Sequence, residues 1–161
     1  MNCYGPQQWW PAQDAFEIIT GAILTQSAAW VNVEKAITNL IAAGALSPDS
    51  IRRLSQDELA RLIYSSGYYN TKAKKLKTFA GWLGKYYDDD FSKLFASDTG
   101  HIRQQLLMVY GIGEETADSI ILYAANKPIF VIDTYTRRII NRVGLAQKNA
   151  GYAKYQKLFM T

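Results

Sequence analysis

The sequence predicts an all-α protein, an orthogonal bundle of about eight short helices. Apolar residues recur at helical spacing along most of the chain. The clearest example is the series Leu76, Phe79, Ala80, Leu83 and Tyr87, at positions i, i+3, i+4, i+7 and i+11. The alternation of apolar and polar residues that is typical of strands is missing, and the connections between helical segments are short.

The first half of the chain carries a start or stop signal for each predicted helix. Two apolar faces mark the first two helices: Phe16, Ile19, Ile23 and Gln26 after Pro11, and Val33, Ala36, Ile37 and Leu40 before Gly44. Ser47-Pro48 supplies an N-cap and a proline at the first helical position. Ser55 and Glu58 form a capping box before the next helix, which we expect to end at Gly67.

The second half predicts two helices joined by a tight glycine turn. Asp98 or Thr99 caps a helix that breaks at Gly111-Ile112-Gly113 and restarts at Glu114, which gives a helix–hairpin–helix over residues 102–125. Pro128 interrupts the pattern again, and the apolar run 129–132 is interpreted as a buried extended segment. A further helix is expected over 134–143.

Length and composition limit the possible protein classes. The chain has 161 residues, of which 48% are hydrophobic and 20% charged, so it has the composition of a folded domain and room for one domain or slightly more. The net charge of +4 permits a polyanionic partner without requiring one. No apolar run suggests a membrane span or a signal peptide, so we expect an intracellular, cytoplasmic protein. The single cysteine, Cys3, excludes an intramolecular disulfide, a four-cysteine zinc site and a four-thiolate iron–sulfur cluster.

The glycine turn is the first candidate binding site. Gly111 and Gly113 leave backbone N–H groups unobstructed by a Cβ, beside the positive end of the following helix. A phosphate would fit against the backbone of Gly111, Ile112 and Gly113, directly or through a bound monovalent cation. The alternative is an ordinary turn between helices, in which the glycines only supply positive φ.

Several motifs occur in a fixed order around this turn. Leu106 to Asp118 contains the pattern Leu-x-x-h-Gly-h-Gly-x-x-Thr-Ala, where h is apolar, and Asp133 follows at the end of an apolar stretch. Upstream lie Leu24-Thr25-Gln26 and the loop Gly67-Tyr68-Tyr69-Asn70-Thr71-Lys72-Ala73. Taken together, over residues 24–142, these motifs resemble those of the endonuclease III superfamily of helix-hairpin-helix DNA glycosylases.

The resemblance implies a fold and a partner. It implies a single domain over 1–161, with a six-helix lobe at 14–128 that includes the hairpin 102–125. Residues 1–13 and 129–161 would form part of a second lobe, which is incomplete. The implied partner is double-stranded DNA that contains a damaged base. We expect a monomer, although an uncovered apolar face would favour self-association.

Asp133 is the expected catalytic residue. Cleavage of an N-glycosidic bond builds oxocarbenium character on the sugar, which a nearby carboxylate stabilises. The same carboxylate can orient a water molecule as a general base. Asp133 is equally suited to cap the helix that starts at Thr134, and the two roles are compatible.

Glu115 is the main departure from the family pattern. Members of the superfamily that also cut the strand place a nucleophilic lysine at this position, and a carboxylate cannot form the Schiff base that this lysine forms. The resemblance therefore implies a monofunctional glycosylase. The alternative is that Glu115 is simply a favourable acid in the first turn of a helix.

Trp9-Trp10-Pro11 supplies two indoles and a rigid ring before the first helix. Such aromatics usually pack against the core, but indole faces also attract cations such as a 3-alkylated purine. A cationic base leaves easily and needs no strong general acid, and His101, the one histidine, is expected at the surface. These features resemble the 3-methyladenine branch of the superfamily, which implies that Trp9, Trp10, Pro11 and Glu115 line the base pocket.

Other residues are expected at the DNA. The resemblance implies that Gln26 fills the gap left by a flipped base, and that Tyr68 wedges into the opposite strand; Tyr69 is as easily a core residue. We expect most side chains of two basic clusters to be solvated: Lys72, Lys74, Lys75 and Lys77 in one, and Arg137, Arg138 and Arg142 in the other. Of these, Lys72 and Arg137 are expected at phosphates.

The predicted function is hydrolysis of the N-glycosidic bond of alkylated purines such as 3-methyladenine in DNA, after base flipping. No cofactor is expected beyond the possible cation. Two alternatives stay open. One is a glycosylase for a neutral mismatched base, uracil or thymine. The other is a catalytically inactive module that binds damaged DNA.

Overall fold

Every regular element that the structure describes is helical, which confirms the all-α prediction. The computed structural model describes residues 9–146 and 150–160; Cys3 lies outside these ranges. The α-helices are α1 (Ala15–Leu24), α2 (Trp30–Ala42), α3 (Pro48–Arg53), α4 (Gln56–Leu62), α5 (Tyr69–Tyr87), α6 (Phe91–Phe95), α7 (Thr99–Leu107), α8 (Glu114–Ser119), α9 (Thr134–Arg142) and α10 (Tyr152–Gln156). A 3₁₀ turn, η1 (Tyr64–Ser66), precedes α5, and a π-helical turn, η2 (Ile120–Ala124), continues α8.

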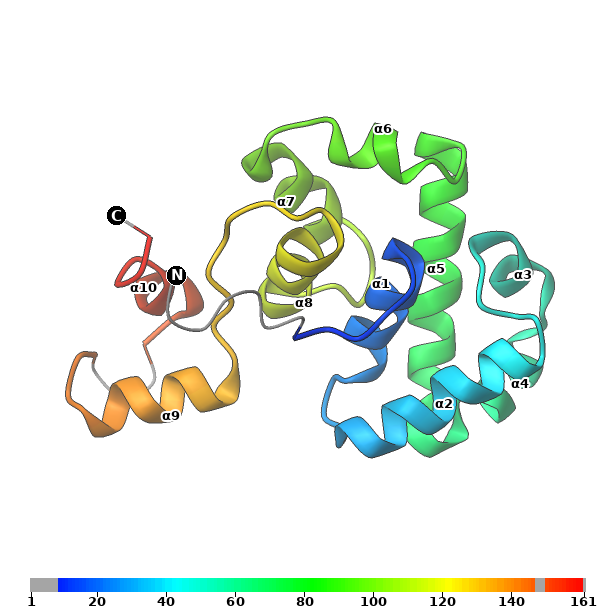
Figure 1. Ribbon diagram of the computed structural model, residues 1–161, viewed down its shortest axis with the longest axis horizontal. Helices are drawn as coiled ribbons and strands as arrows, with labels where there is room; N and C mark the ends of the chain where they lie inside the picture. Colours follow the sequence, from blue (N-terminus) through cyan, green and yellow to red (C-terminus); the bar gives the residue numbers. More distant parts are fainter. Residues whose placement is uncertain (1–8, 147–149, 161) are drawn as a thin grey trace.

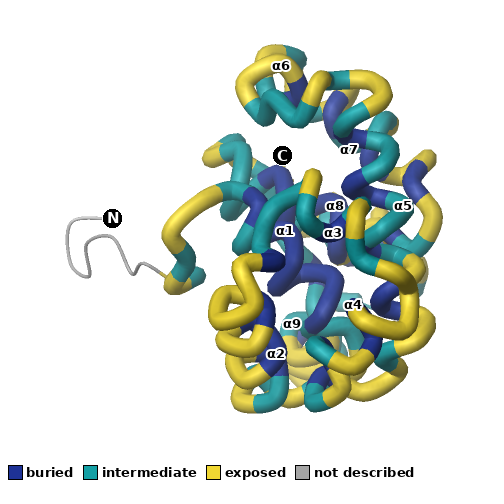
Figure 2. The backbone as a smooth tube through the Cα atoms, turned by 90° about the vertical axis from the view of Figure 1, so that its right-hand side faces the viewer, coloured by how far each residue is buried: buried dark blue, intermediate teal, exposed yellow. Residues whose placement is uncertain are grey.

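Helix α1 forms the centre of a bundle made by α1 to α8 (Figures 1 and 2). All but three of its residues are buried, and it packs against α2, α5, α8 and η2. The long helix α5 supports α3 and α4 on its outer side. The bundle core therefore holds rigidly the elements that precede and follow the glycine hairpin.

The predicted helix starts follow local capping chemistry. Ser47, Asp98 and Asp133 each accept a hydrogen bond from a backbone N–H in the first turn of α3, α7 and α9. Ser55 and Glu58 form the predicted capping box at the start of α4. The sequence reading missed α6, a single turn that begins where the Asp90 carboxylate accepts from the Ser92 N–H.

Helices α9 and α10 lie together at one end of the molecule (Figure 1). They enclose a small apolar cluster of their own, made by the buried residues Ile132, Ile140, Tyr152 and Tyr155. The extended segment 129–132 links this cluster to the bundle, and its last residue, Ile132, is fully buried. On the outer side of α9, Tyr135, Ile139 and Val143 are exposed, so self-association through this face stays a prediction.

The prediction that Lys72 contacts a phosphate is wrong. Its side chain is only 2% exposed, and its Nζ donates to the Leu24 carbonyl at 2.8 Å and the Ser66 carbonyl at 2.6 Å. The ammonium therefore serves two backbone carbonyls inside the bundle and cannot reach solvent. Lys77 plays a similar internal part, because its Nζ donates to the carbonyls of Ile51, Arg52 and Leu54 at the end of α3.

Among the residues that the structure describes, no helix is both long and apolar enough to cross a membrane.

Candidate nucleic-acid interface and active site

The hairpin between α7 and α8 is shaped by its first glycine. Gly111 has φ +88°, a left-handed conformation that side chains other than hydrogen rarely adopt. A Cβ at this position would also collide with the side chain of Lys75. Ile112 turns inward and is buried, so the hairpin presents only backbone there. At Gly113, by contrast, a Cβ would meet no atom within 4 Å, so this side of the turn faces open space.

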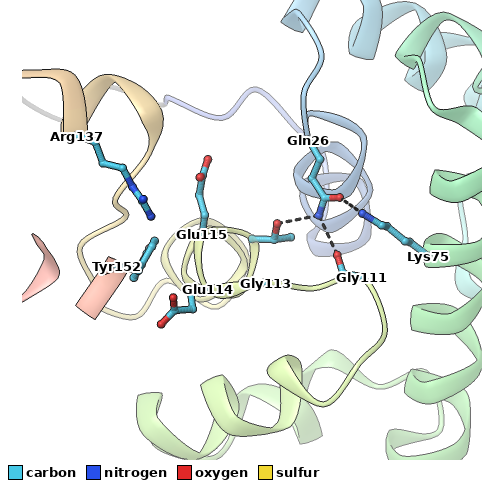
Figure 3. A pocket seen from close by; sticks show the side chains of 9 residues that line it. Gln26, Lys75, Gly111, Gly113, Glu114, Glu115, Arg137 and Tyr152 are labelled. Atoms are coloured by element: carbon cyan, nitrogen blue, oxygen red, sulfur yellow. Dashed lines mark hydrogen bonds between the residues drawn. The ribbon is translucent and has the colours of Figure 1, made fainter. Parts of the chain in front are cut away.

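The hairpin forms one wall of a shallow, open pocket of about 400 Å³ (Figure 3). It is lined by Gln26, Lys75, Gly111, Gly113, Glu114, Glu115, Thr116, Arg137 and Tyr152. These residues come from the turn after α1, from α5, from the hairpin with α8, and from α9 and α10. The fold thus gathers five of the predicted site residues, Gln26, Gly111, Gly113, Glu115 and Arg137, around one depression.

Gln26 connects three of these elements. The prediction that Gln26 lies on the first helix is wrong, because α1 ends at Leu24. The chain then turns at Ser27, which has φ +53°. The amide Nε2 donates to the Gly111 carbonyl at 3.0 Å and to the Thr116 hydroxyl at 2.9 Å, and the Lys75 ammonium donates to Oε1. The Nε2 end of the amide is therefore fixed against the hairpin and α8, and the Oε1 end is fixed against α5.

Two carboxylates and a guanidinium determine the electrostatics of the site. Asp133 is half-buried, and its Oδ1 accepts the Thr136 N–H at 2.7 Å, so it caps α9 as predicted. Partial burial raises the pKa of Glu115, the nearby Asp133 carboxylate raises it further, and Arg137 opposes both effects. Glu115 and Asp133 therefore lie close enough for their negative charges to repel each other. The positive charge of Arg137 partly offsets this repulsion.

The aromatic residues of the N-terminal segment are separated from the lined pocket. Trp9 is 76% exposed and Pro11 is exposed, whereas Trp10 is half-buried against α1 and contacts Trp30 and Tyr123 with ring centroids 5.5 and 5.2 Å apart. The Trp10 Nε1 is buried with no hydrogen-bond partner among the described residues.

Tyr123 contacts this indole and also feels the charge of Asp133. Burial raises the pKa of its hydroxyl, and the Asp133 carboxylate adds to the rise. Trp10 and Tyr123 therefore form an aromatic wall near Asp133, whereas Trp9 and Pro11 are exposed.

Tyr68 is 74% exposed, with a left-handed backbone at φ +46°, directly before α5. Tyr69 is half-buried and contacts Tyr64, with ring centroids 4.7 Å apart. The structure thus presents the first tyrosine of the loop to solvent and turns the second toward the protein. His101 is exposed, as expected.

The sequence reading missed Lys75, Thr116, Tyr123 and Tyr152 as parts of the site. In the sequence Lys75 is one member of a basic cluster, and the prediction of a DNA contact falls on Lys72 of the same cluster instead. The spacing of Tyr152 from the hairpin gives no sign that α10 folds back onto it. The described residues contain no group of three or more histidine, cysteine or carboxylate side chains able to hold a metal ion.

Comparison with known proteins shows to which family the chain belongs. Residues 20–161 match the model of the HhH-GPD superfamily, described as base excision DNA repair proteins. A candidate DNA repair glycosylase of Methanocaldococcus jannaschii is 40% identical over 161 residues, 99% of this chain and 73% of that protein. Endonuclease III of Sulfolobus acidocaldarius is 27% identical over 150 residues, 92% of this chain but only 65% of that protein.

Solved structures show the same fold. The 3-methyladenine DNA glycosylase MagIII of H. pylori, bound to 1,N6-ethenoadenine, has a TM-score of 0.86 and 32% identity, and the match covers 96% of this chain and 72% of that one. An endonuclease III trapped on DNA has a TM-score of 0.79 at 21% identity, which shows a shared fold alone. The helix–hairpin–helix, its pocket and these matches together establish that the chain belongs to the HhH-GPD superfamily of base excision DNA repair proteins.

Proposed function

We propose that this chain is a monofunctional DNA glycosylase that hydrolyses the N-glycosidic bond of alkylated purines, such as 3-methyladenine, in double-stranded DNA. The observation that carries the proposal is the nearness of Asp133, half-exposed beside the hairpin pocket, to Glu115, which stands at the position where the resemblance implies a lysine in strand-cutting members. The likeness to a solved 3-methyladenine DNA glycosylase bound to 1,N6-ethenoadenine supports this substrate class.

The proposed chemistry uses one carboxylate and one water molecule. As the bond between C1′ and the base nitrogen breaks, positive charge develops on the sugar, and the Asp133 carboxylate stabilises it. Water adds to C1′ and gives up a proton, which leaves an abasic site and the free base. An alkylated purine is already cationic, so it departs neutral without protonation by the enzyme.

Other residues would bind and distort the DNA. The open backbone at Gly113 would hold a phosphate, Arg137 would contact the backbone at the pocket rim, and Tyr68 would enter the duplex. Gln26 would fill the vacated space, which requires it to leave its contacts with the hairpin. A monovalent cation remains compatible with the turn, since the Gly111 carbonyl uses one lone pair for Gln26 and keeps a second.

The base pocket would lie at the aromatic wall. Trp10 and Tyr123 offer ring faces that attract a cationic purine by about 0.5 to 2 kcal/mol, depending on desolvation. Glu115, whose repulsion from Asp133 favours a compensating positive charge, would contribute to the same preference. Trp9 and Pro11 would take part only if DNA draws the N-terminal segment inward.

The test uses oligonucleotides that each carry one lesion: 3-methyladenine, 1,N6-ethenoadenine, uracil, or a thymine mismatch. We expect release of the alkylated base, strand cuts only after alkali, and no covalent complex on treatment with borohydride. Asp133→Asn should abolish release while DNA affinity changes less than about twofold, because asparagine still caps α9. Asp98→Asn, at the matching N-cap of α7, should remain active.

Every other outcome contradicts a part of the proposed function. Release of uracil or thymine alone would assign the neutral-base activity, and duplex binding with no abasic product would assign the inactive module. A borohydride-trapped complex would refute monofunctional chemistry. Full activity in Asp133→Asn would refute the role of this carboxylate.

A further inference from the structure

Asp118 is a buried carboxylate that the proposed chemistry does not use. It lies on α8, the second helix of the hairpin, and is 0% exposed. Its Oδ1 accepts the Arg103 Nε–H at 2.7 Å, and its Oδ2 accepts the Gln156 Nε2–H at 2.7 Å. A buried charge of this kind is stable only with such donors, so Asp118 joins α7, α8 and α10 at one point.

Helix α10 in turn holds the segment that carries Asp133. The same Gln156 Nε2 donates to the Phe130 carbonyl at 2.8 Å. The Tyr152 hydroxyl accepts the Ile132 N–H at 3.1 Å, and Ile132 is the residue directly before Asp133. Two side chains of α10 therefore fix the backbone on which the catalytic carboxylate is carried.

Tyr152 ties the two halves of this arrangement together. It is buried and lines the hairpin pocket beside Arg137 (Figure 3). Its ring lies 5.7 Å from the guanidinium group of Arg137 and 5.9 Å from that of Arg103. Burial raises the pKa of its hydroxyl, and the Asp118 carboxylate raises it further, which keeps the hydroxyl neutral. Arg103 reaches Glu114 as well, at 3.3 Å, at the rim of the same pocket.

The small cluster around α9 and α10 has few other attachments to the bundle. Its buried residues form a cluster separate from the bundle core, and among the described residues the bonds above and the segment 129–132 join the two. A catalytic carboxylate works only at a precise distance from the sugar, and a displacement of about 1 Å can cost about a hundredfold in rate. The position of Asp133 relative to the hairpin thus depends on how α10 is held.

We propose that Asp118 is a positioning residue: through Gln156, Arg103 and Tyr152 it holds the Asp133 segment in register with the DNA-binding hairpin. The inference rests on the proposed function, because it requires Asp133 to be catalytic. It assigns a role in the chemical step to a residue that touches neither DNA nor the base.

The test compares single-turnover rates with DNA affinity in the full chain, on an oligonucleotide with one alkylated purine. Asp118→Asn should lower the rate at saturating enzyme by about tenfold or more, while the Kd for DNA changes less than about twofold. Gln156→Ala, which changes no residue of the hairpin itself, should likewise lower the rate without weakening DNA affinity. It keeps the proposal testable if Asp118→Asn fails to fold.

A matched control separates positioning from stability. Asp89→Asn removes a carboxylate that follows α5 and is bonded to Arg52 of α3 at 2.7 and 2.6 Å. It should retain the wild-type rate when assayed well below its melting temperature.

The outcomes distinguish the two proposals. If Asp133→Asn is inactive but Asp118→Asn and Gln156→Ala keep the wild-type rate, the positioning role is refuted and the proposed function stands. A slower rate in Asp89→Asn of equal size would also refute positioning. If Asp133→Asn is fully active, both proposals fail.

Discussion

Lys72 makes the stability of this protein depend on pH in an unusual direction. Burial, and secondarily repulsion from Lys75, lowers the pKa of Lys72 from 10.5 to about 8. The unfolded chain, in which the lysine has its ordinary pKa, therefore binds more protons than the folded protein between these values. Stability should rise with pH in that window, because deprotonation relieves the cost of burying the charge.

The expected change is measurable. Each pH unit between the two pKa values contributes about 1.4 kcal/mol to the free energy of unfolding, so Lys72 should add about 1 kcal/mol between pH 7 and pH 9. The two carbonyls keep their partner throughout, since a neutral amine still has two N–H bonds to donate. Tyr87, Tyr123 and Tyr152 have raised pKa values and oppose the rise only at higher pH.

The assay is urea unfolding, followed by far-ultraviolet circular dichroism at pH 7, 8 and 9. Lys72→Met keeps the length of the side chain but cannot titrate, so its stability should lack the rise seen in the wild type. Lys74→Met, in an exposed neighbour on the same helix, should keep it. Equal changes in the wild type and Lys72→Met between pH 7 and pH 9 would refute the reasoning.

Two further substitutions test the fold around the site. Gly111→Ala should destabilise the protein by at least about 1 kcal/mol in thermal melting and weaken DNA binding, because of its positive φ and the collision with Lys75. Gly81→Ala, in the interior of α5 with open space around it, should instead stabilise by up to about 1 kcal/mol, and the same sign at both glycines would contradict this account. Arg52 lowers the pKa of Asp89 by hydrogen bonding, so this pair should stabilise the protein near neutral pH and lose its effect as acid protonates Asp89. Urea titrations of Asp89→Asn and wild type should therefore differ by roughly 1 kcal/mol at pH 7 and converge below pH 3; a constant difference would count against the ion pair.

The helices could be predicted because their signals are local. Ser55 and Glu58 are three residues apart and cap α4 without help from the rest of the chain. The positive φ of Gly44 and Gly111 follows from the one residue type that adopts it at no steric cost. The cap at Asp133 could be predicted for the same reason, since it depends on adjacent residues.

The contacts around the site could not be predicted because they join distant residues. Lys72 is buried only because the carbonyls of Leu24 and Ser66 meet at its ammonium, and the sequence shows a lysine among lysines. The predicted helical face that includes Gln26 extends two residues beyond the end of α1 at Leu24, and Gln26 instead bonds the distant Gly111 carbonyl. Asp118 and Gln156 lie 38 positions apart, and the residues around each give no sign that their side chains form a hydrogen bond.

The separate apolar cluster of α9 and α10 has a consequence for heat inactivation. Its four buried residues supply far less hydrophobic stabilisation than the bundle core, so this end of the molecule should open locally before the rest melts. Asp133 lies at the junction. Loss of catalysis on warming should therefore precede loss of helical signal, with amide exchange in α9 and α10 faster than in α1, and cooling should restore activity as long as the bundle has stayed folded.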